Sequence, residues 1–248
     1  MKGIKTLSTI FCIMVMIATT VKAQIGESRN VLSFGVNGGV NMNTIGFDPT
    51  IKQMQHLGPT LGVTFRYTCE KYFATICALQ MELNYSQLGW KEDIMNSQNE
   101  KIPDTYQRNM NYIQFPMLAR LGWGREQRGF QFYFLAGPQL GFCFSETSER
   151  SDIWTLNING QPDRPNQVNQ QYEMPIKNKF DYGITGGIGL ELSTKIGHFM
   201  IEGRYYYGLS DIYGNGKTDP FARSNNGTIT AKITYLIDIK SDLDKNKK

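Results

Sequence analysis

Hydrophobic and polar residues alternate with a period of two along much of this chain. Between Phe130 and Ser145, one set of alternate positions includes five phenylalanines, whereas the other is mostly glutamine, glycine and further polar or small residues. This period is typical of a β-strand whose two faces meet different surroundings. A face with five phenylalanines is too apolar to lie in water, so we expect it to contact lipid.

The same alternation recurs in seven further segments, which brings the expected number of strands to eight. These segments lie near 32–43, 57–68, 73–86, 113–121, 181–193, 199–210 and 229–237. The polar row of the first contains Ser33, Asn37 and Asn41. An even number of alternating strands is typical of a closed barrel with a greasy exterior and a polar interior.

The lengths of the connections alternate as well. Short connections are expected near 69–71, 124–129 and 195–197, and long ones near 44–56, 91–108, 146–178 and 211–224. Outer-membrane barrels combine short periplasmic turns with long extracellular loops. We therefore predict an all-β protein, an eight-stranded antiparallel up-and-down transmembrane β-barrel with long extracellular loops, short periplasmic turns and both termini in the periplasm.

The first residues have the features of a cleavable secretory signal. Lys2 and Lys5 precede a short apolar run, and Val21 and Ala23 stand at the −3 and −1 positions of a cleavage site before Gln24. The run is too short to span a bilayer comfortably. We expect a signal peptide at 1–23, a barrel at 24–240 and a charged periplasmic tail at 241–248, which places the protein in the Gram-negative outer membrane.

The formal charge of the whole chain overstates its basic character. Removal of 1–23 takes away three lysines and no acid, which lowers the net charge from +4 to +1. A nearly neutral chain lacks the excess of basic residues that nucleic-acid binding requires, so no nucleic acid is expected as a partner. The partners expected are outer-membrane lipid and secretion or envelope proteins, and the oligomeric state stays open.

The chain offers no recognisable metal, cofactor or catalytic motif. Three cysteines follow the expected signal, Cys69, Cys77 and Cys143, and their odd number and wide spacing favour neither zinc nor a disulfide framework. Neither His56 nor His198 has an acid or cysteine at ligand spacing. We expect no metal site, no cofactor and no catalytic residue.

The polar faces of the strands carry charges that would lie in the lumen. These residues form an expected structural lumen charge cluster: Arg66, Glu82, Arg120, Glu191, Glu202, Arg204 and Lys232. An eight-stranded barrel has just enough interior for side chains, and buried charges persist when they are paired. We predict a closed lumen with a charged plug toward the short turns.

Neutral polar and aromatic residues complete the expected layout. The upper lumen is expected to be a neutral vestibule that draws on Asn37, Asn41, Gln114, Gln139 and Ser145. Interfacial aromatic girdles are expected from Tyr67, Tyr72, Trp123 and Phe130 at the short-turn end and from Tyr85 and Trp90 toward the long loops.

Four segments resemble one known family. They are "NYIQFPMLARL" at 111–121, "GPQLGF" at 137–142, "FDYGITGGIGLEL" at 180–192 and "EGRYYYGLSDI" at 202–212. Together they resemble the PorT-like outer-membrane β-barrel family of Bacteroidota, over about 31–239. The resemblance implies an eight-stranded barrel in the outer membrane without catalytic residues, and its name-giving member is tied to type IX secretion. The charged tail at 241–248 departs from the usual aromatic ending of the last strand.

We interpret the chain as a non-enzymatic barrel with a structural, interaction or secretion-accessory role. One alternative is a surface adhesin or ligand-binding barrel that acts through long loops, chiefly 146–178 with Trp154 and Tyr172. A second is a lipid-modifying barrel enzyme, for which His56, Asp48 and Ser97 stand in the first two long loops. A third is a soluble lipocalin-like carrier, whose apolar row would line a cavity and whose charges would face water.

Overall fold

The computed structural model of the protein describes residues 27–165, 169–172, 174–214 and 221–241. The expected signal peptide at 1–23 and all but Ser241 of the expected tail lie outside these residues. Within the described part of the chain, no helix is long and apolar enough to cross a membrane.

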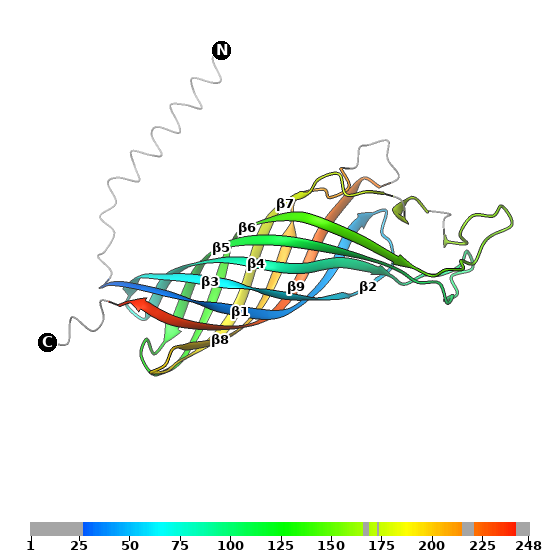
Figure 1. The fold of residues 1–248 in the computed structure, drawn as a ribbon. Coiled ribbons are helices and arrows are strands. Elements are labelled where there is room, and N and C mark those ends of the chain that lie inside the picture. The colour runs from blue at the N-terminus through cyan, green and yellow to red at the C-terminus, as the bar shows by residue number, and fades with distance from the viewer. Residues whose placement is uncertain (1–26, 166–168, 173, 215–220, 242–248) are drawn as a thin grey trace, which may run out of the picture.

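Eight long strands build the fold, and a very short ninth strand extends it (Figure 1). The long strands are β1 (Glu27–Asp48), β3 (His56–Tyr72), β4 (Thr75–Glu92), β5 (Tyr106–Gly124), β6 (Gly129–Arg150), β7 (Phe180–Ser193), β8 (His198–Gly208) and β9 (Arg223–Lys240). The short strand β2 (Gln53–Met54) pairs with the end of β4, and η2 (Gln170–Tyr172) is one 3-10 turn.

The long strands close into a barrel. Each pairs antiparallel with the next along the chain, and β1 also pairs with β9, from Leu32 opposite Lys240 to Asp48 opposite Arg223. Closure leaves no free edge among these strands, so their backbone donors and acceptors are paired within the barrel wall. The predicted all-β antiparallel up-and-down barrel is confirmed.

Alternation along each strand separates two surfaces. On β6, Phe132 and Phe134 point outward with 38% and 49% of their surface exposed, whereas the intervening Tyr133 is 0% exposed. On β9, Ile233 is 63% exposed beside Lys232, which is 3% exposed. The outside of the barrel is therefore apolar and its inside is largely polar, the inverse of a water-soluble barrel.

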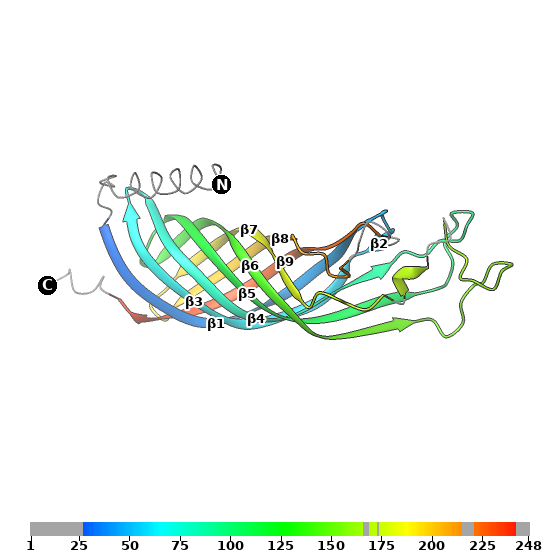
Figure 2. The ribbon, with the colours of Figure 1, turned by 90° about the horizontal axis from the view of Figure 1, so that it is seen from above.

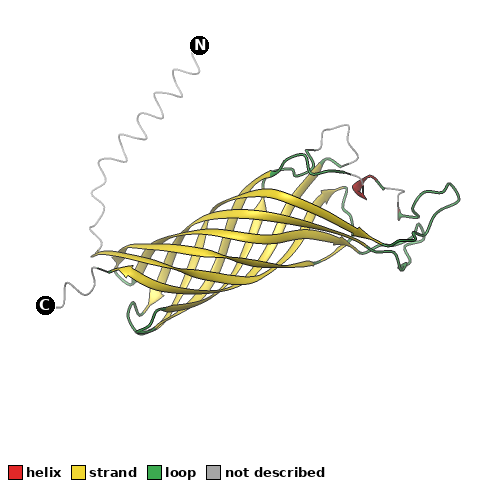
Figure 3. Cartoon of the chain, viewed as in Figure 1, coloured by secondary structure: helices red, strands yellow, loops and turns green. Residues whose placement is uncertain are grey.

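Connections of two lengths separate the ends of the barrel (Figure 3). The short links 73–74, 125–128 and 194–197 lie at one end, here named the short-link end, where β1 also begins and β9 stops. The described residues of the segments 49–55, 93–105, 151–179 and 209–222 lie at the opposite, long-link end.

Glycine is required where two of the short links turn. Gly124 has a φ of 137° and Gly197 a φ of 142°, conformations that residues with a side chain rarely adopt. A Cβ on Gly197 would lie 2.5 Å from the carbonyl oxygen of Leu236 on β9. The chain therefore reverses tightly here while it stays packed on the neighbouring strand.

The long-link end extends beyond the barrel as an arm (Figure 2). Strands β4 to β6 carry it, and isolated bridges between Met95 and Lys101 and between Leu156 and Pro162 continue the ladder into the links. The expected loop from 146 is thus partly strand, since β6 runs on to Arg150.

Two expected orientations are wrong. Trp90, expected in an outer girdle, points into the barrel and is 0% exposed. It lies an even number of residues from Glu82 and Ser86 on β4 and therefore shares their inward face. Ser145 was assigned to the lumen but is exposed. An irregularity in the β5–β6 register, where Asn111 opposes Ser145 but Tyr112 opposes Cys143, moves Ser145 to the outer side.

Candidate functional site

The inside of the barrel holds its densest arrangement of charge, in two groups separated by an apolar layer. Positions along the barrel axis can be followed on strand β1. Its inward residues run from Ser33 near the short-link end through Asn37 and Asn43 to Phe47 at the long-link end.

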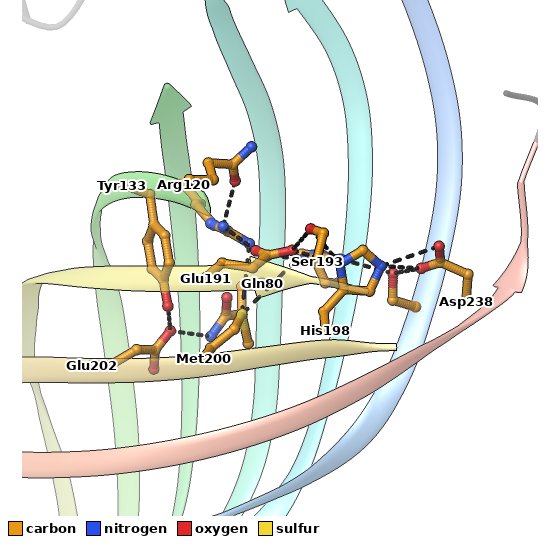
Figure 4. Close-up of polar contacts among 12 residues, drawn as sticks. Gln80, Arg120, Tyr133, Glu191, Ser193, His198, Met200, Glu202 and Asp238 are labelled. Carbon is orange, nitrogen blue, oxygen red and sulfur yellow. Dashed lines mark hydrogen bonds and ion pairs between the residues drawn. The ribbon is translucent and has the colours of Figure 1, made fainter. Parts of the chain in front are cut away.

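The first group is centred on the carboxylate of Glu191 from β7 (Figure 4). This carboxylate accepts a hydrogen bond from Arg66 Nη1 at 2.7 Å and another from Arg120 Nη2. His198 Nδ1 lies 2.7 Å from Glu191 Oε1. Strands β3, β5 and β8 thus each direct a basic side chain at one acid on β7, and all four residues are buried.

A chain of hydrogen bonds continues from this group across β8 and β9. His198 Nε2 lies 3.2 Å from each carboxylate oxygen of Asp238, and Asp238 accepts a hydrogen bond from Ser33 Oγ at 2.6 Å. This role of His198 could not be predicted from the sequence, because both acidic partners come from other strands. One feature of the sequence could have indicated this role: His198 lies an even number of residues from Glu202 on β8, so both side chains point into the barrel.

A thin apolar layer lies next to the first group. It consists of Leu118, Tyr133, Leu135, Met200 and Leu236, all at most 2% exposed. The Arg120 guanidinium carbon lies 3.7 Å from the centre of the Tyr133 ring, and the Tyr133 hydroxyl donates to Glu202 Oε1 at 2.7 Å. Tyr133 therefore links the two charged groups.

The second group is centred on Glu82 from β4. Arg204 Nη1 and Nη2 donate to its two carboxylate oxygens at 3.0 and 2.6 Å, and Lys232 Nζ donates at 2.7 Å. Arg204 also donates to Glu202. The amides of Gln80 and Asn84 donate to Glu82 at 2.8 and 2.9 Å. This carboxylate is held by five donors from β4, β8 and β9.

The structure therefore places all seven residues of the sequence-derived lumen cluster inside the barrel and divides them between the two groups. Arg66, Arg120 and Glu191 lie in the first, and Glu82, Glu202, Arg204 and Lys232 in the second. The second group is neutral in sum, with two acids against two bases. Removal of the acidic or of the basic residues would leave buried charges without partners, which is strongly destabilising.

Neutral polar residues follow the second group, as expected for Asn37, Asn41, Gln114 and Gln139, which are all at most 8% exposed. Asn37 Nδ2 donates to Asn84 Oδ1 at 2.9 Å. The space that Asn41, Gln114 and Gln139 border together with neighbouring strands holds only about 20 Å³. This part of the lumen is a packed polar layer rather than a vestibule.

The long-link mouth is closed by an apolar cluster, where the sequence had indicated a polar opening. Its buried members include Phe47, Leu88, Trp90, Tyr106, Met110, Tyr112, Ile212, Tyr213 and Phe221. The rings of Phe47 and Trp90 lie 5.2 Å apart, and Trp90 Nε1 donates to the Tyr213 hydroxyl at 3.2 Å. The mouth is filled because inward residues change from polar to aromatic near this end of β1 and β4.

The aromatic residues of 151–179 fold down onto this cluster. The rings of Trp154 and Tyr172 lie 4.5 Å apart, and Tyr172 lies 4.8 Å from Tyr106. Arg164 sits 4.8 Å above the Trp154 ring and pairs with Asp104 at 3.1 Å. These aromatic side chains thus cap the barrel, which leaves other residues to form the outer surface of the arm.

The residues considered for lipid-modifying chemistry do not form a site. His56 Nε2 hydrogen-bonds with Asn109 Oδ1 at 2.6 Å and lies 3.4 Å from Gln107 Nε2. No contact among the described residues joins His56 to Asp48 or Ser97. The described residues also contain no group of three or more His, Cys, Asp or Glu that could hold a metal ion.

The comparison with protein families gives one match. The model of a family described as "Outer membrane protein beta-barrel domain" matches residues 22–214. No curated protein matches the chain.

Several solved structures are similar in fold. Ail, the attachment invasion locus protein of Yersinia pestis, is 13% identical, with 85% of this chain and 99% of that chain covered and a TM-score of 0.34. OprG from Pseudomonas aeruginosa is 10% identical, with coverage of 86% and 97% and a TM-score of 0.40. Neisserial surface protein A is 12% identical, with coverage of 82% and 96% and a TM-score of 0.37.

Proposed function

The chain belongs to the outer membrane protein beta-barrel domain family, and on this premise we propose that it is a non-enzymatic structural or interaction barrel whose lumen is closed to ions. Its apolar outer face meets outer-membrane lipid, and its ends are available to other envelope components. The PorT-like resemblance and a secretion-accessory role belong to this proposal.

The observation that carries the proposal is the filled interior. Beyond the short-link mouth, the lumen contains in turn an ion-pair group, an apolar layer, a second ion-pair group, a packed polar layer and an aromatic cluster. An ion that crossed would have to separate the contacts of Glu82 with Arg204 and Lys232 and then displace the rings around Trp90. Both steps oppose conduction, since each exposes buried groups without replacing their partners.

Recordings in planar bilayers test the closed lumen. The mature chain is refolded in detergent, its folding is verified by heat-modifiable migration in a gel, and it is then inserted at single-molecule density. We expect no steady conductance, only rare transients. A stable, ion-sized conductance in most insertions would show that the lumen is open and would refute the proposal.

The orientation and processing of the chain are also part of this proposal. We propose cleavage after Ala23, periplasmic short links, a periplasmic tail at 241–248 and extracellular long links, as barrels of this kind have. N-terminal sequencing of the mature protein should begin at Gln24. Protease added to intact cells should cut within 151–179 and spare the link 125–128; the opposite pattern would reverse the orientation.

A second candidate, binding at the cell surface, is favoured by the tip of the arm. Ile153, Leu156 and Ile158 are 86%, 57% and 103% exposed there, although apolar side chains of this size usually find cover. Replacement of all three by serine should abolish attachment of expressing cells to a host-cell layer. Unchanged attachment would leave only the closed structural barrel, and co-purification in mild detergent would then identify its envelope partners.

A further inference from the structure

A large cavity opens inside the short-link end of the barrel. It holds about 850 Å³ and is bounded by the first charged group, by the links 125–128 and 194–197 and by the end of β9. This volume is in the range of small-molecule sites. The cavity is separate from the aromatic cluster, which fills the opposite mouth.

The lining of the cavity is predominantly cationic. Five basic side chains, Arg29, Arg66, Arg120, Arg128 and Lys195, line it against three carboxylates, Glu126, Glu191 and Asp238. Among the ion pairs of the described residues, neither Arg128 nor Lys195 has a carboxylate partner. The excess of positive charge is therefore concentrated at the rim.

Two of these cations also retain unused donors in the deep wall. The Nε atoms of Arg66 and Arg120 find no acceptor among the described residues, although the two side chains are 4% and 2% exposed. A buried donor without an acceptor is destabilising. Both arginines also line the cavity, and guanidinium groups suit phosphate and carboxylate geometry.

The rim cations lie close to one another. Arg128 ends the link before β6 and Lys195 lies in the link after β7, and these neighbouring strands pair with Gly129 opposite Ser193. Both side chains belong to exposed residues. A ligand that enters from this side would therefore meet two cations before it reached the buried arginines.

The remaining rim is held in place by an ion-pair bridge. Glu126 receives Arg29 Nε at 2.6 Å from the start of β1 and Lys71 Nζ at 2.6 Å from β3. In the ring of strands, β1 and β3 do not adjoin β6, so this bridge ties the link 125–128 to the other side of the mouth. The bridge pairs Arg29 and Lys71 with a carboxylate, which reduces their contribution to the positive charge of the rim, and it gives the mouth a defined shape.

From these features we propose that the short-link cavity is a binding site for a small ligand with a phosphate or carboxylate group and at least two negative charges. Arg128 and Lys195 attract the ligand, and Arg66 and Arg120 contact its oxyanion. The binding itself is independent of the closed lumen, whereas its location on the periplasmic side rests on the proposed orientation.

Calorimetric titration of the refolded mature chain in uncharged detergent micelles tests this site. The probes are inorganic phosphate and citrate, with a neutral sugar as the uncharged comparison. We expect phosphate or citrate to bind at one site per chain, with an affinity that falls as salt is added, and we expect no binding of the sugar. Absence of saturable binding of both anions, together with no rim-dependent response to an anionic lipid, would overturn the proposal.

Matched variants locate the site. The double substitution Arg128→Gln and Lys195→Gln should weaken binding by at least about tenfold, which corresponds to ~1.4 kcal/mol. The substitutions Lys177→Gln and Lys179→Gln remove the same charge from exposed residues at the long-link end and should leave the affinity unchanged. Equal weakening by both pairs would show a general effect of net charge and would overturn the site.

One further variant and one further probe complete the test. Arg120→Lys keeps the charge but removes the Nε donor and the planar group, so we expect weaker binding in a protein that still shows heat-modifiable folding. Phosphatidylglycerol added to the micelles distinguishes the source of the oxyanion. A rim-dependent response to this lipid alone would assign the site to a lipid headgroup, and a response to the soluble anions would assign it to a free ligand.

Discussion

Glu82 shows how much one buried side chain can determine in this barrel. Its carboxylate pairs with Lys232 and Arg204 and is held by amides on its own strand. A buried ion pair adds little stability compared with apolar packing, but the loss of one partner is costly. The second charged group is therefore best understood as a set of mutually dependent residues.

Replacement of Glu82 by glutamine should reduce the free energy of unfolding by about 3–5 kcal/mol, because Lys232 would remain buried without its carboxylate while Arg204 kept only its pair with Glu202. Urea unfolding of the refolded protein in detergent micelles, followed by tryptophan fluorescence, measures this. Glu70→Gln is the control, since Glu70 is an exposed acid on the neighbouring strand β3. Equal effects of the two substitutions would mean that Glu82 is not paired as described.

Glu126 gives the short-link end a dependence on pH. Partial burial acts to raise the pKa of this carboxyl, but hydrogen bonds from Arg29 and Lys71 outweigh it and hold the pKa below its ordinary value. The stabilisation is therefore fully present above the unfolded pKa of about 4.3 and is lost as the pH falls through the lower folded value. The group is partly solvated, so the effect stays below about 1 kcal/mol.

The prediction is that Glu126→Gln lowers the stability of the protein slightly at pH 7 and not at all in strong acid, where the wild-type carboxyl is also neutral. Melting curves of both proteins, taken from pH 7 to pH 3, would show the two midpoints converge. A constant difference across this range would indicate that the ionised form of Glu126 plays no part.

At the scale of the strands, the sequence revealed which face a residue takes but not which residue it meets. Period two follows from strand geometry, so Lys232 and Ile233 could be assigned to opposite faces without knowledge of the fold. The ion-pair partner of Lys232 could not, because Glu82 lies on β4, which is not a neighbour of β9 and faces it only in the closed barrel. The irregular register near Ser145 could not be predicted for a similar reason, because it arises from the pairing of β6 with β5.

The outer face of β9 offers a direct test of strand orientation. Ile233→Lys should destabilise the protein by about 2–4 kcal/mol in a bilayer, since it places a charge against hydrocarbon. Ile158→Lys is the matched control, because Ile158 is exposed outside the strands at the tip of the arm. We expect the control to lie within about 0.5 kcal/mol of the wild type in reversible unfolding from lipid vesicles. A similar cost at both positions would contradict the assignment of these two surfaces.

For the whole molecule, the two ends of the barrel are built differently. Aromatic residues close the long-link mouth, whereas the short-link mouth leads into a cationic cavity beneath the Glu126 bridge. Only one part of this asymmetry, the charged residues of the lumen, could be predicted from the sequence. The charged residues were recognised because they alternate with apolar residues along each strand. The aromatic closure was missed because Trp90 was expected on the outer face and because Trp154 and Tyr172 reach the mouth from a distant link.

The central claim is that the outer face of this barrel meets lipid while its interior is shielded. Trp123 lies on the outer face with 37% of its surface exposed, and Trp90 lies inside with 0% exposed. Trp90→Phe with Trp154→Phe leaves only Trp123, and Trp123→Phe with Trp154→Phe leaves only Trp90. In vesicles whose acyl chains are brominated near the headgroup, we predict strong quenching of Trp123 fluorescence and none of Trp90. Equal quenching of both, or protection of Trp123, would contradict this account.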